Sequence, residues 1–393
     1  MITDNSILDV VKNTVNTNNK VSIADVLIDR FYEELISKHD KELLKLAFSR
    51  NPTQADLNDF LTKWDIEVAG GNKALILSYF MKEHTDLKCT DYEQPRLEGL
   101  LRFYRFHNLK LIAHFTKIGQ ELNKKNIEVM LLKGGAMKFL RPNLSRHMGD
   151  IDILVPAKDY TKAGETATSL GYDCSWDVHS VDLHQNGSEE GILDIHKYIF
   201  MDTGFEEKLN KGLFDRAKRA KVFGVDALVP CHEDMFFIAL VNMARNLRNN
   251  TSSAGMLFTL FDCKFLLEDK PDFDWDIVIK NTKITKTEVQ MGFVVQFINK
   301  IIPNLLPEQL RNNKQLKKET DNYCNIVMYN RFSIYDMKMR CRELKLKDAI
   351  SNFATFKEYI TLKPKYFLLK QIRRNPLAIK AFYKVTKKNK IEI

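Results

Sequence analysis

The chain has 393 residues, of which 44% are hydrophobic and 28% are charged. This length exceeds what one hydrophobic core usually fills, and the composition is that of a globular chain, which excludes a mainly disordered one. No segment is apolar for long enough to cross a membrane, and the N-terminus lacks the pattern of a secretory signal. Six cysteines stand singly, without a CxxC motif. We therefore expect a cytoplasmic protein of two or three packed units with reduced thiols.

The formal net charge of +9 is concentrated at the C-terminus. Residues 362–393 hold ten basic residues and one acid, which accounts for the whole excess. The balanced remainder argues against a nucleic-acid platform spread over the body of the protein. The tail itself leaves open a contact with RNA, an anionic membrane surface or an acidic partner, as well as a simple solvated helix.

The first part of the chain, to about residue 125, has apolar residues at three- and four-residue spacing, which predicts helices. The pattern changes at Ile127, where IEVMLLKGG predicts a short strand that ends in two glycines. A helix is expected from about Ala136 to Leu140. The alternating DIDILVP then predicts a second strand that stops at a proline.

Further along, KDYTKAGETATSLGY predicts a helix, and the polar DCSWDVHSVDLHQNGS has strand character. GILDIHKYIF predicts a strand, AKVFGVDALVP a further strand region, and helices dominate from His232. The expected fold class is α/β (α+β), with a small mixed sheet flanked by helical regions. We predict an N-terminal helical region over 1–94, a core over 95–230, and a C-terminal helical region with its basic tail over 231–393.

Two carboxylates define the first candidate site. A strand directs residues i and i+2 to one face, about 6–7 Å apart, so Asp150 and Asp152 are expected to project together. Such a pair repels itself unless a proton or a divalent cation lies between the two groups. Mg²⁺ suits the pair because it prefers oxygen ligands and keeps positions for substrate phosphates.

Gly134 and Gly135 lie between the first predicted strand and its helix. Backbone N–H groups without a Cβ beside them, at the positive end of a helix dipole, can bind phosphate. Lys133 and Arg146 bring cationic side chains to the same segment, where they could contact a triphosphate. The four residues are therefore candidates for nucleotide binding.

A third carboxylate is expected because in-line displacement at phosphorus by two metal ions needs one to hold the ion that activates the attacking hydroxyl. Asp194 is the best candidate, since ILDIH predicts a strand in which Asp194 and His196 share one face. His196 is interpreted as a phosphate-facing residue or a support for Asp194. A zinc site that adds His179 and His184 is not favoured, because their spacing is loose.

ELNKKNIEVMLLKGG, RHMGDIDILV and LDIHKY, taken together over residues 95 to about 280, resemble a bacterial family of uncharacterised nucleotidyltransferases in the DNA polymerase β superfamily. LVPCHEDMFFIAL and TLFDCKFLLEDKPDFDWDIV resemble the helical region that follows the core of that family. The resemblance implies that Gly134 and Gly135 bind nucleotide, that Asp150 and Asp152 bind metal, and that Asp194 completes the triad.

The helical region after the core carries two further groups of residues. Asn242, Arg245, Asn246 and Asn249 have the spacing of one polar helix face, which is either solvated or lines a cleft for base, ribose or acceptor. Asp262 and Trp275 are interpreted as helix-packing residues.

The function expected from these features is transfer of a nucleoside monophosphate from an NTP, with ATP expected, to an acceptor hydroxyl. Two Mg²⁺ ions would be held by Asp150, Asp152 and Asp194. A small-molecule acceptor, such as an aminoglycoside-like sugar, is favoured because the charge outside the tail is balanced. The alternatives are transfer to RNA or tRNA, as in toxin-type relatives, and an inactive nucleotide-binding scaffold.

Overall fold

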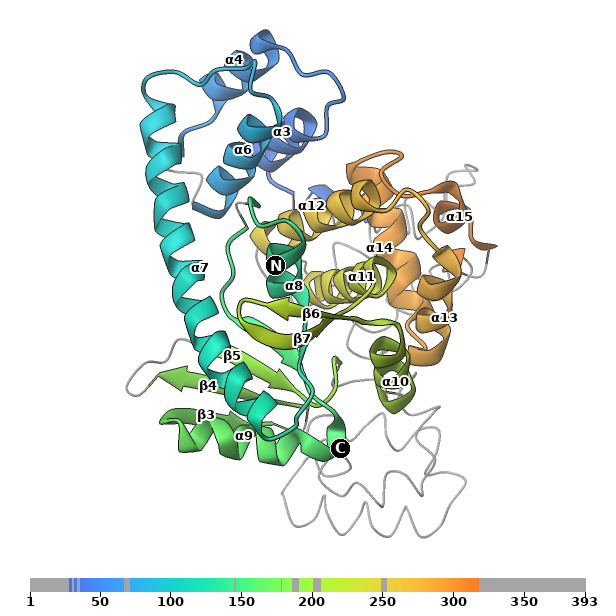
Figure 1. Ribbon diagram of the computed structural model, residues 1–393. Coiled ribbons are helices and arrows are strands. Elements are labelled where there is room, and N and C mark those ends of the chain that lie inside the picture. The colour runs from blue at the N-terminus through green and yellow to red at the C-terminus, as the bar shows by residue number, and fades with distance from the viewer. Residues whose placement is uncertain are drawn as a thin grey trace, which may run out of the picture. The chain divides into compact units, whose positions relative to one another are not determined.

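Seven strands form one mixed sheet in the part of the chain that the structure describes (Figure 1). The computed structural model describes residues 28–29, 32–33, 36–66, 71–144, 146–177, 179–185, 191–200, 206–248, 253–314 and 316–317. The strands are β1 Met130–Leu131, β2 Ile151–Leu154, β3 Tyr172–Trp176, β4 Ser180–Gln185, β5 Gly191–His196, β6 Lys218–Val222 and β7 Val225–Val229. Their order is β3-β4-β5-β2-β1-β7-β6. The pairs β2–β5 and β1–β7 are parallel, and the other neighbours are antiparallel.

Strand β2 lies in the middle of the sheet, and all four of its residues are buried. Ile151, Ile153 and Leu154 are fully enclosed, as expected for a strand covered on both faces. Asp152 is buried with them, at 6% exposure. A buried carboxylate is costly without polar partners, so its surroundings are the first place to look for a site.

Strands β6 and β7 form a tight hairpin. The two residues between them, Phe223 and Gly224, have φ values of 48° and 85°. Positive φ at both central positions is the geometry of a type I′ turn, whose twist matches that of the flanking strands. The single strand region expected over AKVFGVDALVP is therefore two paired strands.

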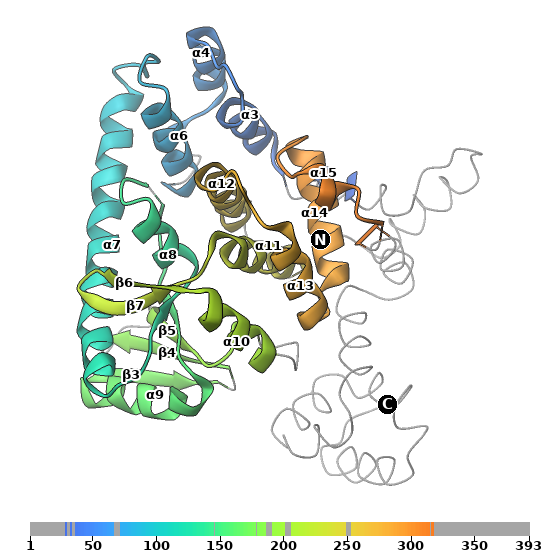
Figure 2. The ribbon, with the colours of Figure 1, turned by 45° about the vertical axis from the view of Figure 1, so that its right-hand side comes forward.

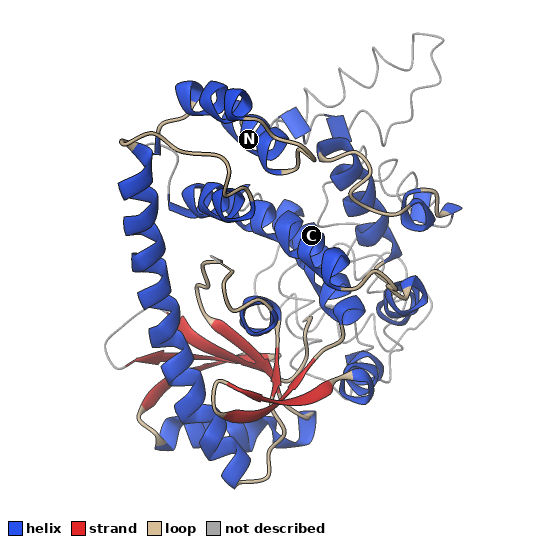
Figure 3. Ribbon diagram, turned by 45° about the horizontal axis from the view of Figure 1, so that its top comes forward, coloured by secondary structure: helices blue, strands red, loops and turns tan. Residues whose placement is uncertain are grey.

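Helices α7, Glu93–Lys124, and α9, Tyr160–Ser169, pack on the sheet. α7 contacts β2, β5 and β7, and α9 contacts β3 and β5. Figures 1 and 3 show α7 running past the strands along its C-terminal half. The buried side chains of α7 recur at helical spacing on the face turned inward: Leu111, Phe115, Ile118 and Leu122.

Helix α7 and the β6–β7 hairpin approach closely at Gly119. A Cβ on Gly119 would lie 2.7 Å from Val225 Cγ1, whereas Gly99 on the same helix has nothing within 4 Å. We expect Gly119→Ala to lower the free energy of unfolding by about 1–3 kcal/mol through overpacking. Gly99→Ala should raise it by about 0.5–1 kcal/mol, because alanine favours the helix. Urea unfolding of the two variants measures the difference, and equal effects would contradict this packing.

Of the remaining helices, α3, α4 and α6 precede the strands in the sequence, α8 and α10 lie between strands, and α11 to α15 follow β7. Helix α8 follows β1, and α11 packs against α8 as well as against α12, α13 and α14 (Figure 2). Thr53 begins α4 with a reciprocal capping box to Asp56. Their bounds are α3 Lys38–Ala47, α4 Gln54–Lys63, α6 Gly71–Glu83, α8 Lys133–Leu140, α10 Glu206–Arg216, α11 His232–Arg248, α12 Ser253–Asp269, α13 Trp275–Thr285, α14 Glu288–Ile301 and α15 Glu308–Arg311.

The expected α/β class with a mixed sheet and flanking helices is confirmed. Two local predictions need correction. Helix α8 begins at Lys133 and not near Ala136, because both glycines lie within its first turn. Asp150 precedes β2 and is not part of that strand, which begins at Ile151.

Residues 28–199 and 206–317 form one compact unit. Division of the chain at residues 94 and 230 stays a prediction, and the basic tail over 362–393 lies outside the described residues. None of the helices in the described ranges combines the length and apolar character needed to cross a membrane.

Candidate active site

Three aspartates lie in one row across three neighbouring strands. Asp152 on β2 is the register partner of Asp194 on β5, and Asp194 is in turn the partner of Asp182 on β4. Directly opposed residues on paired strands project from the same face of the sheet. The pairing of β2 with β5 thus brings Asp194 beside Asp152. Asp182 is an additional carboxylate that was not predicted from the sequence.

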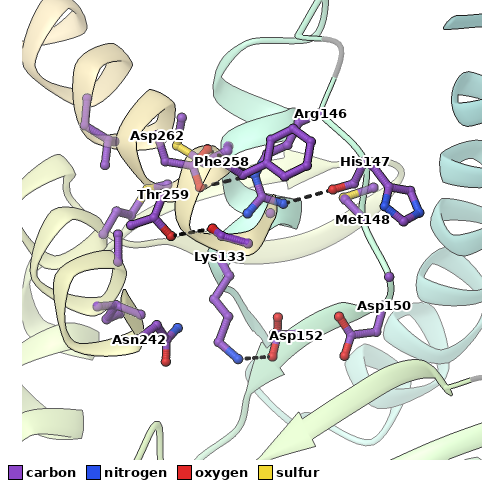
Figure 4. A pocket seen from close by; sticks show the side chains of 18 residues that line it. Lys133, Arg146, His147, Met148, Asp150, Asp152, Asn242, Phe258, Thr259 and Asp262 are labelled. Carbon is purple, nitrogen blue, oxygen red and sulfur yellow. Dashed lines mark hydrogen bonds and ion pairs between the residues drawn. The ribbon is translucent and has the colours of Figure 1, made fainter. Parts of the chain in front are cut away.

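Two cationic side chains contact Asp152 from opposite directions. Lys133 Nζ lies 2.5 Å from Asp152 Oδ1, as Figure 4 shows, and His196 Nε2 lies 2.8 Å from the same oxygen. His196 Nε2 also lies 2.9 Å from Asp194 Oδ2. His196 is only 3% exposed, so this imidazole is buried between two carboxylates and does not face solvent.

These contacts decide which groups are charged. Burial alone would raise the pKa of Asp152, but Lys133 and His196 hold it well below its usual range. Burial would lower the pKa of His196, yet the hydrogen bonds to Asp152 and Asp194 raise it to about 9. Burial likewise opposes the charge of Lys133, and Asp152 outweighs it and raises the pKa of this amine. At neutral pH the centre therefore holds ionised Asp152 between two cations.

The outer two carboxyl groups behave differently from Asp152. Loss of bulk water around Asp150, followed by repulsion from Asp152, raises its pKa to about 6. Partial burial and a hydrogen bond to Asp194 raise the pKa of Asp182 to about 6 as well. Burial opposes the charge of Asp194, but hydrogen bonds from His196 and Asp182 lower its pKa. The shared proton of that pair therefore lies on Asp182 when the pH is below about 6, and Asp194 is the more acidic of the two.

The centre fits a divalent cation by its donor set. One ligand atom each from Asp152, Asp194 and His196 lie within 4.8 Å of one another. Asp194 Oδ1 is buried and has no hydrogen-bond partner among the described residues, which leaves it available to a ligand. Two of the three predicted metal ligands belong to this group. The third, Asp150, lies beside it, and His196, held by hydrogen bonds to both carboxylates, is the remaining member of the group.

The turn from β1 into α8 carries the other predicted residues. Lys133 has φ 44°, a left-handed conformation that is uncommon for a residue with a side chain. Gly134 lines a pocket above Asp150 and Asp152, whereas Gly135 packs on Leu131 beneath. Of the two glycines, Gly134 is the one placed to meet a ligand.

Arg146, predicted to contact a triphosphate, is held by an acid from a distant helix. Its Nε donates to Asp262 on α12, at 3.0 Å and 3.1 Å from the two carboxylate oxygens, and its Nη1 donates to the carbonyl of His147. A Cβ on Gly134 would lie 2.3 Å from Arg146 Nη1. The guanidinium therefore occupies the space that the missing side chain of Gly134 leaves, next to the turn.

The pocket has a volume of about 480 Å³ and two chemically different walls. Lys133, Asp150 and Asp152 form one wall, and α11 and α12 provide the other through Asn242, Phe258, Thr259 and Asp262 (Figure 4). Asn242 thus faces the cleft, which agrees with the interpretation that this helix face lines a cleft and is not simply solvated. The side chains of Arg245 and Asn246, and Asn249 as a whole, lie outside the described residues.

Sequence reasoning missed Asp182 and the role of Asp262. The alternation in SVDLHQ, where Val181 and Leu183 are buried and Asp182 is exposed, repeats the pattern of LDIHK and could have indicated Asp182. Asp262 is a buried acid in the apolar segment TLFDCKFLL, and such a residue needs a cationic partner. Its interpretation as a pure packing residue left that partner unidentified.

A carboxylate centre beside a glycine turn on a mixed sheet is the arrangement expected of a nucleotidyltransferase. The chain belongs to the family described as "Uncharacterised nucleotidyltransferase", whose family model matches residues 75–303, more than half of the sequence. The match extends beyond the region over which the sequence motifs resembled this family. The protein is therefore an enzyme of the nucleotidyltransferase class.

Two solved structures are similar over part of the chain. The antibiotic-resistance factor ANT(2'')-Ia is 10% identical, with a TM-score of 0.34, and the match covers 46% of this chain and 92% of that one. An antigenic nucleotidyltransferase-like protein from Paracoccidioides brasiliensis is 13% identical, with a TM-score of 0.33, covering 53% and 92%. No curated protein matches the sequence.

Proposed function

We propose that the protein transfers a nucleoside monophosphate from an NTP, ATP first among them, to an acceptor hydroxyl, as enzymes of the DNA polymerase β superfamily do. The observation that supports this most is the cross-strand pair of Asp152 and Asp194, with an unpartnered Asp194 oxygen, below a pocket whose rim is Gly134. Asp150, Asp152 and Asp194 are the proposed ligands of Mg²⁺. Bound Mg²⁺ would neutralise the phosphate charge and lower the pKa of the attacking hydroxyl.

The residues of the chain then have separate tasks. Lys133 places a positive charge beside Asp152, where the phosphates of the NTP must approach. Asp194 accepts the proton of the acceptor hydroxyl while the oxygen of that hydroxyl bonds to the α-phosphorus. The bond from that phosphorus to the bridging oxygen breaks, and pyrophosphate leaves with the electron pair. His196, buried behind the carboxylates, holds Asp152 and Asp194 in one orientation.

A small molecule remains the proposed acceptor. A pocket of about 480 Å³ has the volume of a small-molecule site, and its second wall offers Phe258, Thr259 and Asn242 for an aromatic contact and hydrogen bonds. The cytoplasm is the proposed location. The location rests on the sequence alone, and the acceptor assignment rests on the pocket and on the sequence.

The test uses purified protein, Mg²⁺ and each of the four NTPs labelled at the α-phosphate, incubated with a cell extract. We expect label in a small-molecule fraction and release of pyrophosphate. Label in RNA would replace the small-molecule acceptor with the alternative one. An absence of labelled product with every NTP would contradict nucleotidyl transfer itself.

The raised pKa of Asp150 predicts how cation binding depends on pH. Because a cation must displace the proton from this carboxyl group, affinity for Mn²⁺ should fall by up to about tenfold for each pH unit below about 6, and level off above it. In the cation-free protein, raising the pH has the opposite effect, because it lowers the stability of the folded state. The proton stabilises the folded state below the ordinary pKa of 3.8, and this stabilisation is lost as the pH rises to about 6. Calorimetric titration with Mn²⁺ between pH 5 and 8 measures the first effect, and a flat affinity would contradict it.

A further inference from the structure

A second cavity, which we call the basic pocket, adjoins the catalytic pocket. It has a volume of about 380 Å³, and Arg146 lines both cavities. Its walls come from α6, α7, α8 and the loop after α8, and none of Asp150, Asp152 and Asp194 lines it. Its charged side chains are Lys82, Glu98, Arg102, Arg105, Lys138 and Arg146.

The charge of the basic pocket is not balanced by the acids that line it. Glu98 is the one lining carboxylate among the described residues, and its nearest approach to Arg102 is 3.7 Å, with both side chains well exposed. Such an exposed pair neutralises little. Within the described chain no ion pair is found for Arg105 or Lys138, whereas Arg146 is already engaged by Asp262.

Two lysines are held inside the cavity by backbone carbonyl groups. Lys138 Nζ donates to the carbonyl oxygens of Pro142, at 2.5 Å, and Leu144, at 3.0 Å. Lys82 Nζ, from α6, donates to the carbonyl of Asn143, at 3.4 Å. Both amines thus contact residues 142–144, although the side chain of Lys82 is itself exposed. Burial, and then the charge of Arg105, lower the pKa of Lys82, and burial, Lys82 and Arg105 lower that of Lys138.

Cations that crowd together in this way are stabilised by an anion that contacts several of them at once. A phosphate group carries up to two negative charges on three or more oxygens, so it can accept hydrogen bonds from a lysine amine and an arginine fork together. We propose that the basic pocket binds a phosphate group of the acceptor substrate. This inference rests on the proposed nucleotidyl transfer, and it names the acceptor class as a phosphate monoester or diester.

The shared wall explains how such a phosphate would serve the reaction. Arg146 and the loop that carries it separate the basic pocket from Asp150 and Asp152, so a phosphate held on one side places the rest of the acceptor at the mouth of the other. His147, next in the chain, lines the catalytic pocket and contacts the ring of Tyr104, which lines the basic pocket. The two cavities therefore have adjoining walls along residues 146–147.

Binding is tested with inorganic phosphate in metal-free buffer, so that no divalent cation in the catalytic pocket can bind the probe. The full-length protein is compared with the double variant Lys82→Gln/Arg105→Gln and with the control Lys280→Gln, an exposed lysine on α13 outside both pockets. We expect the double variant to bind phosphate at least about tenfold more weakly and the control to match the wild type. Equal phosphate affinity in all three proteins would overturn the proposal.

Two further measurements, thermal unfolding of the variants and the salt dependence of phosphate affinity, separate a lost binding site from a lost fold. Lys82 and Arg105 are both exposed at the surface, so thermal unfolding of the double variant should match that of the wild type. If that variant unfolds early, the single change Arg105→Gln takes its place. Wild-type phosphate affinity should also fall steeply between 50 and about 200 mM NaCl, and an affinity independent of salt would count against an electrostatic site.

The source of the phosphate is found from the labelled product. Acceptor extract is pretreated with phosphatase or with ribonuclease, and each enzyme is removed before labelled NTP, Mg²⁺ and protein are added. Loss of product after phosphatase supports a small phosphorylated acceptor, and loss after ribonuclease supports the phosphodiesters of RNA. A product that survives both treatments, and also a nonspecific phosphodiesterase followed by phosphatase, overturns the acceptor assignment. If no product forms in untreated extract, the proposed transfer fails, although phosphate binding can still be measured.

Discussion

Replacing Asp152 with asparagine should reduce nucleotidyl transfer by at least about 10³-fold. Asp152 is the one carboxylate that contacts both Lys133 and His196, and its pKa is well below the usual range because of them. The amide that replaces it carries no charge, so a cation at this centre loses a ligand. Lys133 also loses the partner that keeps it charged and in place, and His196 keeps only Asp194.

The loss of activity must be separated from a loss of folding, because breaking a buried ion pair costs about 3–5 kcal/mol. Thermal unfolding of Asp152→Asn is therefore measured beside its activity, and Mn²⁺ binding is measured by calorimetry. Asp226 is an exposed aspartate on β7, and Asp226→Asn is the matched control. It should leave thermal unfolding, activity and Mn²⁺ binding near wild type. A folded Asp152→Asn protein with wild-type turnover would exclude the proposed carboxylate centre.

Local sequence patterns predicted much of the sheet. The alternation in DIDILV and LDIHK indicates strands with one polar face, and it correctly predicted β2 and β5, the strands that carry Asp152 and Asp194. Their approach could be expected because the chemistry needs three carboxylates together. The register that aligns Asp152 with Asp194, however, depends on pairing between strands that are far apart in the sequence.

The sequence could not show which partners the charged residues find. Arg146 and Asp262 are 116 residues apart, and only the packing of α12 near the β1–α8 turn brings them together. His196 was interpreted as a phosphate-facing residue or a support for Asp194, and its contacts to Asp152 and Asp194 agree with the second interpretation. The basic pocket could not be predicted for the same reason, because its cations are separated in the sequence and are brought together by α6, α7 and α8.

Gly134→Ala should lower nucleotidyl transfer by about 10–100-fold with little change in stability. The new Cβ would lie 2.3 Å from Arg146 Nη1, which is the far end of a flexible side chain, so the guanidinium can move and the fold is preserved. Alanine also favours a helix over glycine by about 1 kcal/mol, which offsets part of the strain. The displaced guanidinium then leaves its place beside the turn, which shifts Nη1 most and weakens the bond from Nε to Asp262 without abolishing it. Steady-state turnover and urea unfolding measure the two effects, and a large loss of stability would contradict this account.

A double-mutant cycle with Asp262→Asn identifies the cause. If Gly134→Ala acts by moving Arg146 away from Asp262, the second substitution adds little to the first, because both break the same pair. If the methyl group blocks phosphate at the turn, the two losses of turnover multiply. Gly149→Ala provides the comparison, since a Cβ there meets nothing within 4 Å although the residue lines the same pocket, so its effect should be much smaller. Full multiplication of the two effects would show that Gly134 serves the phosphates directly, and non-additivity would show that its missing side chain makes room for the arginine.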